Sequence, residues 1–291
     1  MIDAVRRAAA GTAFLAAGCA RRNRAGYGTV PGLRLAVLHA EDTDRPDAWW
    51  RLIEACAKRF ELASPDDLVD LAGGRPPAGD KLLFTMDDGH ARTFQPLAQL
   101  AQRGIRIIYF VVPSFIGRTA REYLAWHRAR GVDAFNLAGS ADLDAARGLA
   151  PAQLRELEAM GHLIGAHNDA HRSMAALDEA GIAYEIDGAA TQLEELLGHP
   201  VEDFAWAFGS IQHAPAAARA AARARYARVY SSIRGLNVPG ATPTVLMRDP
   251  ISVAYPHVFN MACLRGALDH RTASARQRLL AETGRLPREP R

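Results

Sequence analysis

Short apolar runs that alternate with helical segments are the feature that most constrains the fold of this chain. The runs with the length and composition of strands are 33–39, 81–86, 105–112, 162–166, 203–208 and 227–232. Helical spacing of apolar residues separates most of them, at 48–60, 94–103, 151–160, 178–197 and 215–225. Strands that alternate with helices predict parallel pairing. We therefore expect an α/β fold in which these strands form a (β/α) barrel, complete or incomplete.

Length and composition limit what such a fold can do. The 291 residues fit one large domain or two small ones, and 49% hydrophobic with 23% charged residues is typical of a soluble globular protein. The net charge is +3, and no central basic stripe interleaved with aromatic residues is present. We therefore expect no nucleic-acid partner. No apolar run reaches 18 residues, so we also expect no transmembrane span.

The N-terminus allows two interpretations. Residues 6–19 begin with Arg6-Arg7, continue in a short apolar run and end at Cys19, as in a secretion signal or a lipoprotein site. The same stretch also fits an amphipathic helix. We expect a cytoplasmic protein, with export or lipid anchoring at the cell envelope as the alternative. The chain is then divided into a helical or signal-like segment (1–32), one barrel domain (33–270) and a polar C-terminal tail (271–291).

Carboxylates and histidines follow two of the predicted strands. Asp87 and Asp88 come directly after the run 81–86, and His167 follows the run 162–166, with His171 four residues later. In a (β/α) barrel, functional side chains lie at the carboxyl ends of the strands. Two histidines and one carboxylate are a common ligand set for catalytic Zn²⁺, and they also suit Co²⁺, Ni²⁺ or Fe²⁺. Taken separately, an Asp-Asp-Gly triplet also fits an ordinary turn, and a pair of histidines four residues apart also fits an exposed surface.

Three sequence motifs strengthen the functional interpretation. Thr85–Gly89 (TMDDG) resembles the T-F-D-D-G motif of the polysaccharide deacetylases, the NodB-like carbohydrate esterases. Gly165–His171 (GAHNDAH) resembles their H-[S/T]-x-x-H motif, and Phe204–Gly209 (FAWAFG) resembles their F-A-Y-P-F-G motif. The order and spacing of the family are kept from about residue 33 to residue 240.

This resemblance implies a fold, a reaction and roles for individual residues. The fold would be the distorted (β/α) barrel of the NodB-homology type. The reaction would be removal of N-acetyl groups from an amino sugar in a polysaccharide or its precursor, as in exopolysaccharide biosynthesis. Asp88, His167 and His171 would bind Zn²⁺ or another divalent transition metal such as Co²⁺ or Ni²⁺, and Asp87 would be the catalytic base.

The chain also departs from the family pattern. Ala205 stands where the third motif often has an Arg that pairs with the catalytic Asp, and Asn168 replaces the Ser or Thr of the second motif. The family's L-x-H motif supplies the general acid from a strand end. Leu268-Asp269-His270 matches this motif, but in a helical context. We therefore regard His270, and also His257, as candidate general acids, with the alternative that each is an ordinary surface histidine.

Substrate contacts and overall function remain open on several points. We consider His39, Trp206 and Phe208 as substrate-binding candidates, against the alternative that they pack in the core. The expected partner is an N-acetylated glycan, and the sequence does not define an oligomeric state. Two other functions stay open: a catalytically impaired glycan-binding homologue, and a metal-dependent amidohydrolase acting on a small non-sugar amide.

Overall fold

The computed structural model describes residues 31–288, so nearly all of the signal-like segment 1–32, including Cys19, lies outside the described residues. The described chain forms two compact units. The first contains the described residues up to Thr85 and those from Ser232 onward, and the second is Met86–Ser231. Each unit is described by itself below.

The first unit contains strands near both ends of the chain. Its strands are β1 (Gly32–Leu38), β2 (Glu61–Leu62), β3 (Asp80–Met86, of which the last residue belongs to the second unit) and β8 (Arg248–Pro250). Its helices are α2 (Pro46–Ala57), α3 (Pro65–Ala72), α9 (His257–Leu264) and α10 (Ala273–Thr283). β1 lies between β3 and β8, and the β1–β8 and β2–β3 pairs are parallel.

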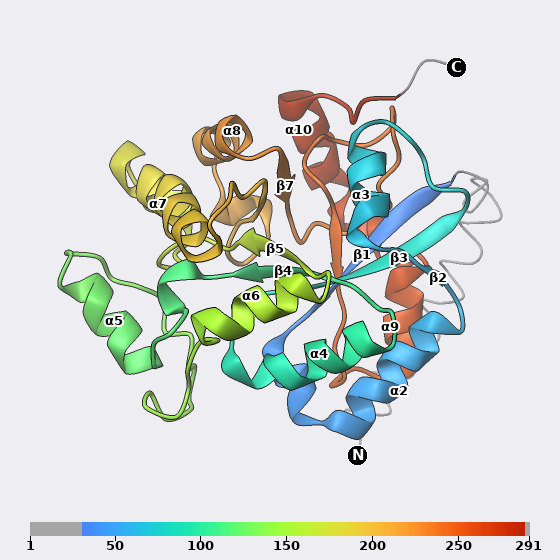
Figure 1. Ribbon diagram of the computed structural model, residues 1–291. Coiled ribbons are helices and arrows are strands. Elements are labelled where there is room, and N and C mark those ends of the chain that lie inside the picture. The colour runs from blue at the N-terminus through green and yellow to red at the C-terminus, as the bar shows by residue number, and fades with distance from the viewer. Residues whose placement is uncertain (1–30, 289–291) are drawn as a thin grey trace, which may run out of the picture. The chain divides into compact units, whose positions relative to one another are not determined.

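The second unit is a run of β-α repeats. Its strands are β4 (Ile108–Val111), β5 (Leu163–Ala166), β6 (Asp203–Ala205) and β7 (Arg228–Tyr230), paired in that order and all parallel. Its helices are α4 (Phe94–Gln102), α5 (Ala120–Arg128), α6 (Pro151–Ala159), α7 (Glu179–Leu197) and α8 (Ala216–Arg225). α7 and α8 pack side by side (Figure 1). The expected α/β class with parallel strands is therefore confirmed.

Burial explains why the strands are easy to find in the sequence. Every residue of β1 and of β4 is buried, so both faces of these strands are covered. A parallel strand that is covered on both faces is a continuous apolar run instead of an alternating one. The helices begin and end at residues with clear local reasons. Pro151 opens α6, and Gly198, at a φ of 83°, ends α7 in the left-handed conformation.

The C-terminal segment is more ordered than a polar tail. α10 lies within residues 271–291, and its Leu279 is fully buried. Leu286, beyond the end of this helix, is 4% exposed. Part of the tail is therefore packed within the first unit. No helix in the part of the chain that the structure describes is long and apolar enough to cross a membrane.

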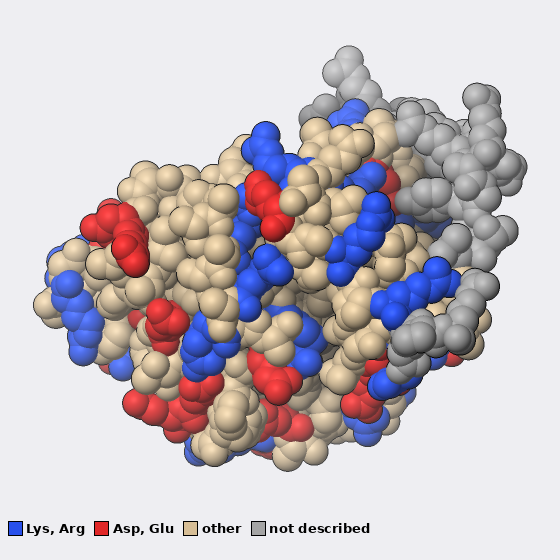
Figure 2. All heavy atoms as spheres, turned by 90° about the horizontal axis from the view of Figure 1, so that it is seen from above, with Lys and Arg blue, Asp and Glu red and all other residues tan. Residues whose placement is uncertain are grey.

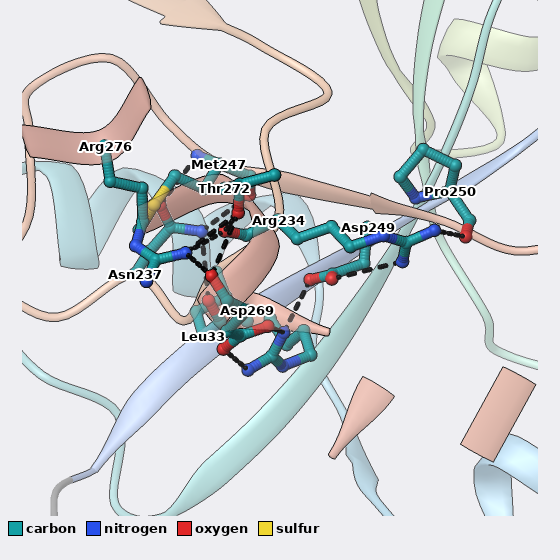
Figure 3. A network of polar contacts seen from close by, with 10 residues as sticks. Leu33, Arg234, Asn237, Met247, Asp249, Pro250, Asp269, Thr272 and Arg276 are labelled. Carbon is teal, nitrogen blue, oxygen red and sulfur yellow. Dashed lines mark hydrogen bonds and ion pairs between the residues drawn. The ribbon is translucent and has the colours of Figure 1, made fainter. Parts of the chain in front are cut away.

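A buried polar network holds the strands of the first unit (Figure 3). Arg34 on β1 donates to Asp249 on β8 at 2.7 Å and to both carboxylate oxygens of Asp269 at 3.0 and 3.2 Å. Arg234 adds a hydrogen bond to the backbone oxygen of Pro250 at 2.9 Å. The face of the protein drawn in Figure 2 carries acidic as well as basic side chains.

Candidate metal centre

The two adjacent aspartates follow β3 at a sharp turn of the chain. β3 ends at Met86, and Asp88 and Gly89 have positive φ values of 83° and 94°. A side chain on Gly89 would also approach Val111 Cβ to 3.1 Å. Successive residues of a strand point to opposite faces, so two neighbouring carboxylates reach one site only where the strand has ended. The turn does this, because Asp87 and Asp88 lie 3.8 and 3.7 Å from the same atom, His167 Nε2.

The two histidines approach from the loop that follows β5. His167 is the first residue after the strand, and its Nδ1 lies 2.6 Å from the backbone oxygen of Ala205. That contact makes Nδ1 the donor and leaves Nε2 as the ligand atom. His171 Nε2 lies 3.4 Å from Asp88 Oδ1, while its buried Nδ1 has no hydrogen-bond partner among the described residues.

Asn168 shapes this loop. Its side-chain oxygen accepts a hydrogen bond from the backbone N–H of Ala207 at 3.1 Å, and its side-chain NH₂ donates to the backbone oxygen of Arg172 at 3.1 Å. Asn168 has a φ of 57°, a conformation that Asn tolerates better than most residues. The replacement of the family's Ser or Thr by Asn therefore has a structural reason: the amide joins the second and third motifs.

Backbone strain is concentrated at this place. Among the described residues, the non-glycine residues with positive φ are Asp88, Asn168, His171 and Phe208. They follow β3, β5 and β6, and all belong to the three sequence motifs. Left-handed conformations of non-glycine residues cost free energy, and residues strained in this way tend to cluster at functional sites. The packing of the surrounding strands must maintain them.

The separations of the donor atoms fit a divalent metal ion. The ligand atoms of Asp88, His167 and His171 all lie within 4.8 Å of one another. Among the described residues, these three form the cluster of His, Cys, Asp or Glu side chains that is close enough to hold a metal ion. Tetrahedral Zn²⁺ with bonds of about 2.0–2.1 Å places its ligand atoms roughly 3.3 Å apart. The separations of 3.4 and 3.7 Å from Asp88 Oδ1 are close to this value.

The charge state of Asp88 suits the same role. Burial raises the pKa of the Asp88 carboxyl, but its hydrogen bond to His171 and the charges of His171 and His167 outweigh burial and hold the pKa well below its usual range. Asp88 is therefore a carboxylate at neutral pH. Two imidazoles and one carboxylate are a donor set that zinc, cobalt and nickel accept.

Glu185 supports the histidine loop from behind, a role that the sequence analysis missed. Its Oε2 accepts hydrogen bonds from the backbone N–H groups of Asp169 and Ala170 at 3.2 and 3.1 Å. Its Oε1 accepts from Arg172 Nε at 2.6 Å, and the Glu185 side chain is fully buried. The available sequence indication was an acidic residue between Tyr184 and Ile186 on the apolar side of a helix.

The structure separates the substrate candidates of the sequence analysis. Phe208 is 40% exposed and its ring lies 5.0 Å from that of His171. Trp206 is fully buried, with its Nε1 donating to the backbone oxygen of Ser210 at 3.1 Å. His39 belongs to the first unit, where it is exposed directly after β1. Its role in substrate binding stays a prediction.

The two candidate acids also belong to the first unit. His257 is exposed at the start of α9. His270 is exposed in a short 3₁₀ helix, where its Nδ1 lies 3.0 Å from the backbone oxygen of Ala267. The family's L-x-H motif ends a strand, whereas Leu268-Asp269-His270 lies at a 3₁₀ helix. The identity of the acid stays a prediction.

Solved structures share the architecture. The Streptococcus pyogenes deacetylase PplD in complex with acetate is similar over 81% of this chain and 99% of its own, with 15% identity and a TM-score of 0.59. IcaB from Ammonifex degensii is similar over 81% of this chain and 97% of its own, with 19% identity and a TM-score of 0.58. The deacetylase domain of BpsB from Bordetella bronchiseptica is similar over 77% of this chain and 96% of its own, with 18% identity and a TM-score of 0.56. The fold is therefore the NodB-type (β/α) barrel that the motifs implied.

The sequence comparisons give the family. A search of curated proteins found no match. The family model described as polysaccharide deacetylase matches residues 74–227, a range that contains all three motifs and the whole candidate metal centre. That range is more than half of the chain. The chain therefore belongs to the polysaccharide deacetylase family.

Proposed function

We propose that this protein is a metal-dependent hydrolase that removes N-acetyl groups from an amino sugar in a polysaccharide or its precursor. The observation that carries this proposal is the convergence of Asp87, Asp88, His167 and His171 at strand ends. Asp88, His167 and His171 are the proposed metal ligands, and Asp87 is the proposed base. The names of two of the similar structures support the chemistry, since PplD and the BpsB domain are called deacetylases and PplD is in complex with acetate.

Each proposed role follows from a residue's position. A divalent metal at this site would lower the pKa of a water molecule and polarise the acetamide carbonyl. Asp87 lies beside the ligand set, 3.8 Å from His167 Nε2, and is 8% exposed, so its carboxylate can accept a proton from water in the site. The contact between His167 Nδ1 and Ala205 fixes the ring so that Nε2 faces the two aspartates.

The strained backbone serves the same end. The turn at Asp88 and Gly89 presents two adjacent carboxylates to one site, which an extended strand does not do. Asp88 can then bind the metal while Asp87 stays available as the base. Geometry of this kind exists before the substrate arrives, so little reorganisation is needed during the reaction.

Acetate release tests the proposal. The purified protein is treated with a chelator, then supplied with Zn²⁺, Co²⁺ or Ni²⁺, and incubated with oligomers of N-acetylglucosamine. We expect acetate and a free amine only from the metal-loaded protein. Full metal binding without acetate release from any acetylated glycan tested would contradict the proposed hydrolysis. Acetate release that is unaffected by the chelator would contradict the metal requirement.

A further inference from the structure

Two exposed phenylalanines lie beside the candidate metal centre. Phe135 is 45% exposed and Phe208 is 40% exposed, and their ring centroids are 5.2 Å apart at an interplanar angle of 85°. A single exposed apolar residue is ordinary on a protein surface. Here two large aromatic rings contact each other as well as solvent, so they form one small apolar patch instead of two scattered residues.

Both rings also contact the same metal-ligand candidate. The His171 ring lies 5.1 Å from Phe135 and 5.0 Å from Phe208. His213 extends the group on the other side, with its ring 4.8 Å from that of Phe208. A molecule that rests on this pair therefore lies directly next to the proposed reaction centre.

The backbone positions of the two phenylalanines are fixed, although their rings face solvent. Phe208 is held at a φ of 63° after β6. The backbone N–H of Phe135 donates to the backbone oxygen of Ala170 at 3.0 Å, immediately before His171. The neighbours of Phe135 at 134, 137 and 138 pack against a core cluster around Phe115 and Tyr123. The exposure of Phe135 is therefore a feature of an anchored segment.

We propose that Phe135 and Phe208 form an aromatic platform for the pyranose ring that carries the acetamido group. A pyranose has an apolar face of C–H groups and a rim of hydroxyls. Aromatic rings cover that face and gain the free energy of removing it from water. A polar group is available for the rim, since His213 stands beside Phe208 with its Nδ1 2.9 Å from Ser173 Oγ.

The size of the patch favours a sugar over a protein partner. Stable protein–protein interfaces bury on the order of 1,000 Å² or more, which two side chains do not supply. A single sugar ring matches two aromatic side chains. This inference rests on the proposed function, and it adds that residues 129–150, outside the three family motifs, contribute to recognition of the sugar through Phe135.

The test compares two acetylated substrates. Metal-loaded parent, Phe135→Ala and Phe135→Tyr are assayed on an oligomer of N-acetylglucosamine and on 4-nitrophenyl acetate, which has no sugar. For Phe135→Ala we expect about a tenfold loss of kcat/KM on the oligomer, mainly through a higher KM, and little change on the ester. Phe135→Tyr keeps the ring and should stay close to the parent on both.

Tyr255→Ala is the matched control, because Tyr255 is 43% exposed in the first unit and its ring also meets a neighbour, Phe259, at 5.3 Å. This control should leave both substrates unaffected. An unchanged KM of Phe135→Ala for the oligomer, or an equal loss on the two substrates, would overturn the platform.

A binding measurement separates this inference from the proposed function. Calorimetric titration of N-acetylglucosamine pentamer into metal-loaded protein does not need turnover. Suppose that the parent binds the pentamer but releases no acetate, and that Phe135→Ala binds the pentamer at least about tenfold more weakly. That result would support the aromatic platform and contradict the proposed hydrolysis. If Phe135→Ala binds the pentamer as tightly as the parent, the platform is wrong whether or not the enzyme turns over.

Discussion

At the scale of single residues, the site depends on backbone conformations that most side chains avoid. Asp88, Asn168 and His171 all adopt positive φ, and each is fixed by a contact within the second unit. In the histidine loop, the buried carboxylate of Glu185 holds the residues beside His171, since it accepts from the backbone N–H groups of Asp169 and Ala170 and from Arg172. If this loop binds a metal as proposed, Glu185 positions His171 through its neighbours Ala170 and Arg172.

We therefore expect Glu185→Ala to weaken metal binding by about 10–100-fold, the range typical of residues that orient metal ligands. Glu185→Gln keeps one acceptor oxygen and should lose less. The measurement is calorimetric titration of metal into chelator-treated protein. Glu195→Ala on the exposed side of the same helix is the control and should bind metal like the parent. Unchanged affinity of a folded Glu185→Ala would show that the loop holds its shape without this carboxylate.

At the scale of elements, the sequence predicts most strands and helices of both units because apolar periodicity reports burial directly. β8 is the informative exception. Its Arg248 and Asp249 are fully buried, so hydropathy gives no indication of a strand at this position. The side chain of Asp249 is satisfied by Arg34, a residue 215 positions away. Pairing over such a distance is not visible in a single sequence. The same limit applies to Glu185 and Phe135, whose partners lie on other elements.

Helix α5 lies between residues 112 and 151, where the sequence analysis predicts no strand or helix. Its His127 is buried, with Nε2 2.9 Å from Ser114 Oγ and Nδ1 3.0 Å from Tyr184 Oη. Burial lowers the pKa of His127 to about 4. Because the unfolded chain takes up this proton near pH 6.5, the stability that neutral His127 provides is present above pH 6.5 and is lost as the pH falls toward 4.

We expect His127→Gln to flatten this pH dependence. In metal-free protein, the free energy of unfolding of the parent should fall between pH 7 and pH 4 more steeply than that of the variant, by on the order of 2 kcal/mol. Denaturant titrations at several pH values measure this difference. Parallel pH curves for the two proteins would mean that His127 has the same pKa in the folded and in the unfolded protein, which would contradict the lowered pKa.

At the scale of the whole molecule, the termini of the fold are joined by charge as well as by apolar packing. Arg34 near the start of the described chain binds Asp249 and Asp269 near its end, and all three side chains are buried. Removing one partner of a buried ion pair leaves an uncompensated charge, which costs far more than losing an exposed pair.

We expect Arg34→Met to lower the free energy of unfolding by about 3–5 kcal/mol. The control is Arg121→Met, which breaks the exposed pair between Arg121 Nε and Asp144 at 2.7 Å and should leave the denaturation midpoint nearly unchanged. Equal effects of the two substitutions would show that the network in Figure 3 contributes no more than a surface pair.

The division of labour between Asp87 and Asp88 is the most direct test of the account, and metal titration of Asp87→Asn and Asp88→Asn side by side measures it. If Asp88 is the ligand, Asp87→Asn should bind metal nearly as well as the parent, and Asp88→Asn should bind at least about tenfold more weakly. Asp87→Asn should also lose at least about 10²-fold in acetate release, since it lacks the proposed base. Weak binding by Asp87→Asn with normal binding by Asp88→Asn would reverse the assignment. Parent-like binding by both variants would contradict the proposed metal centre.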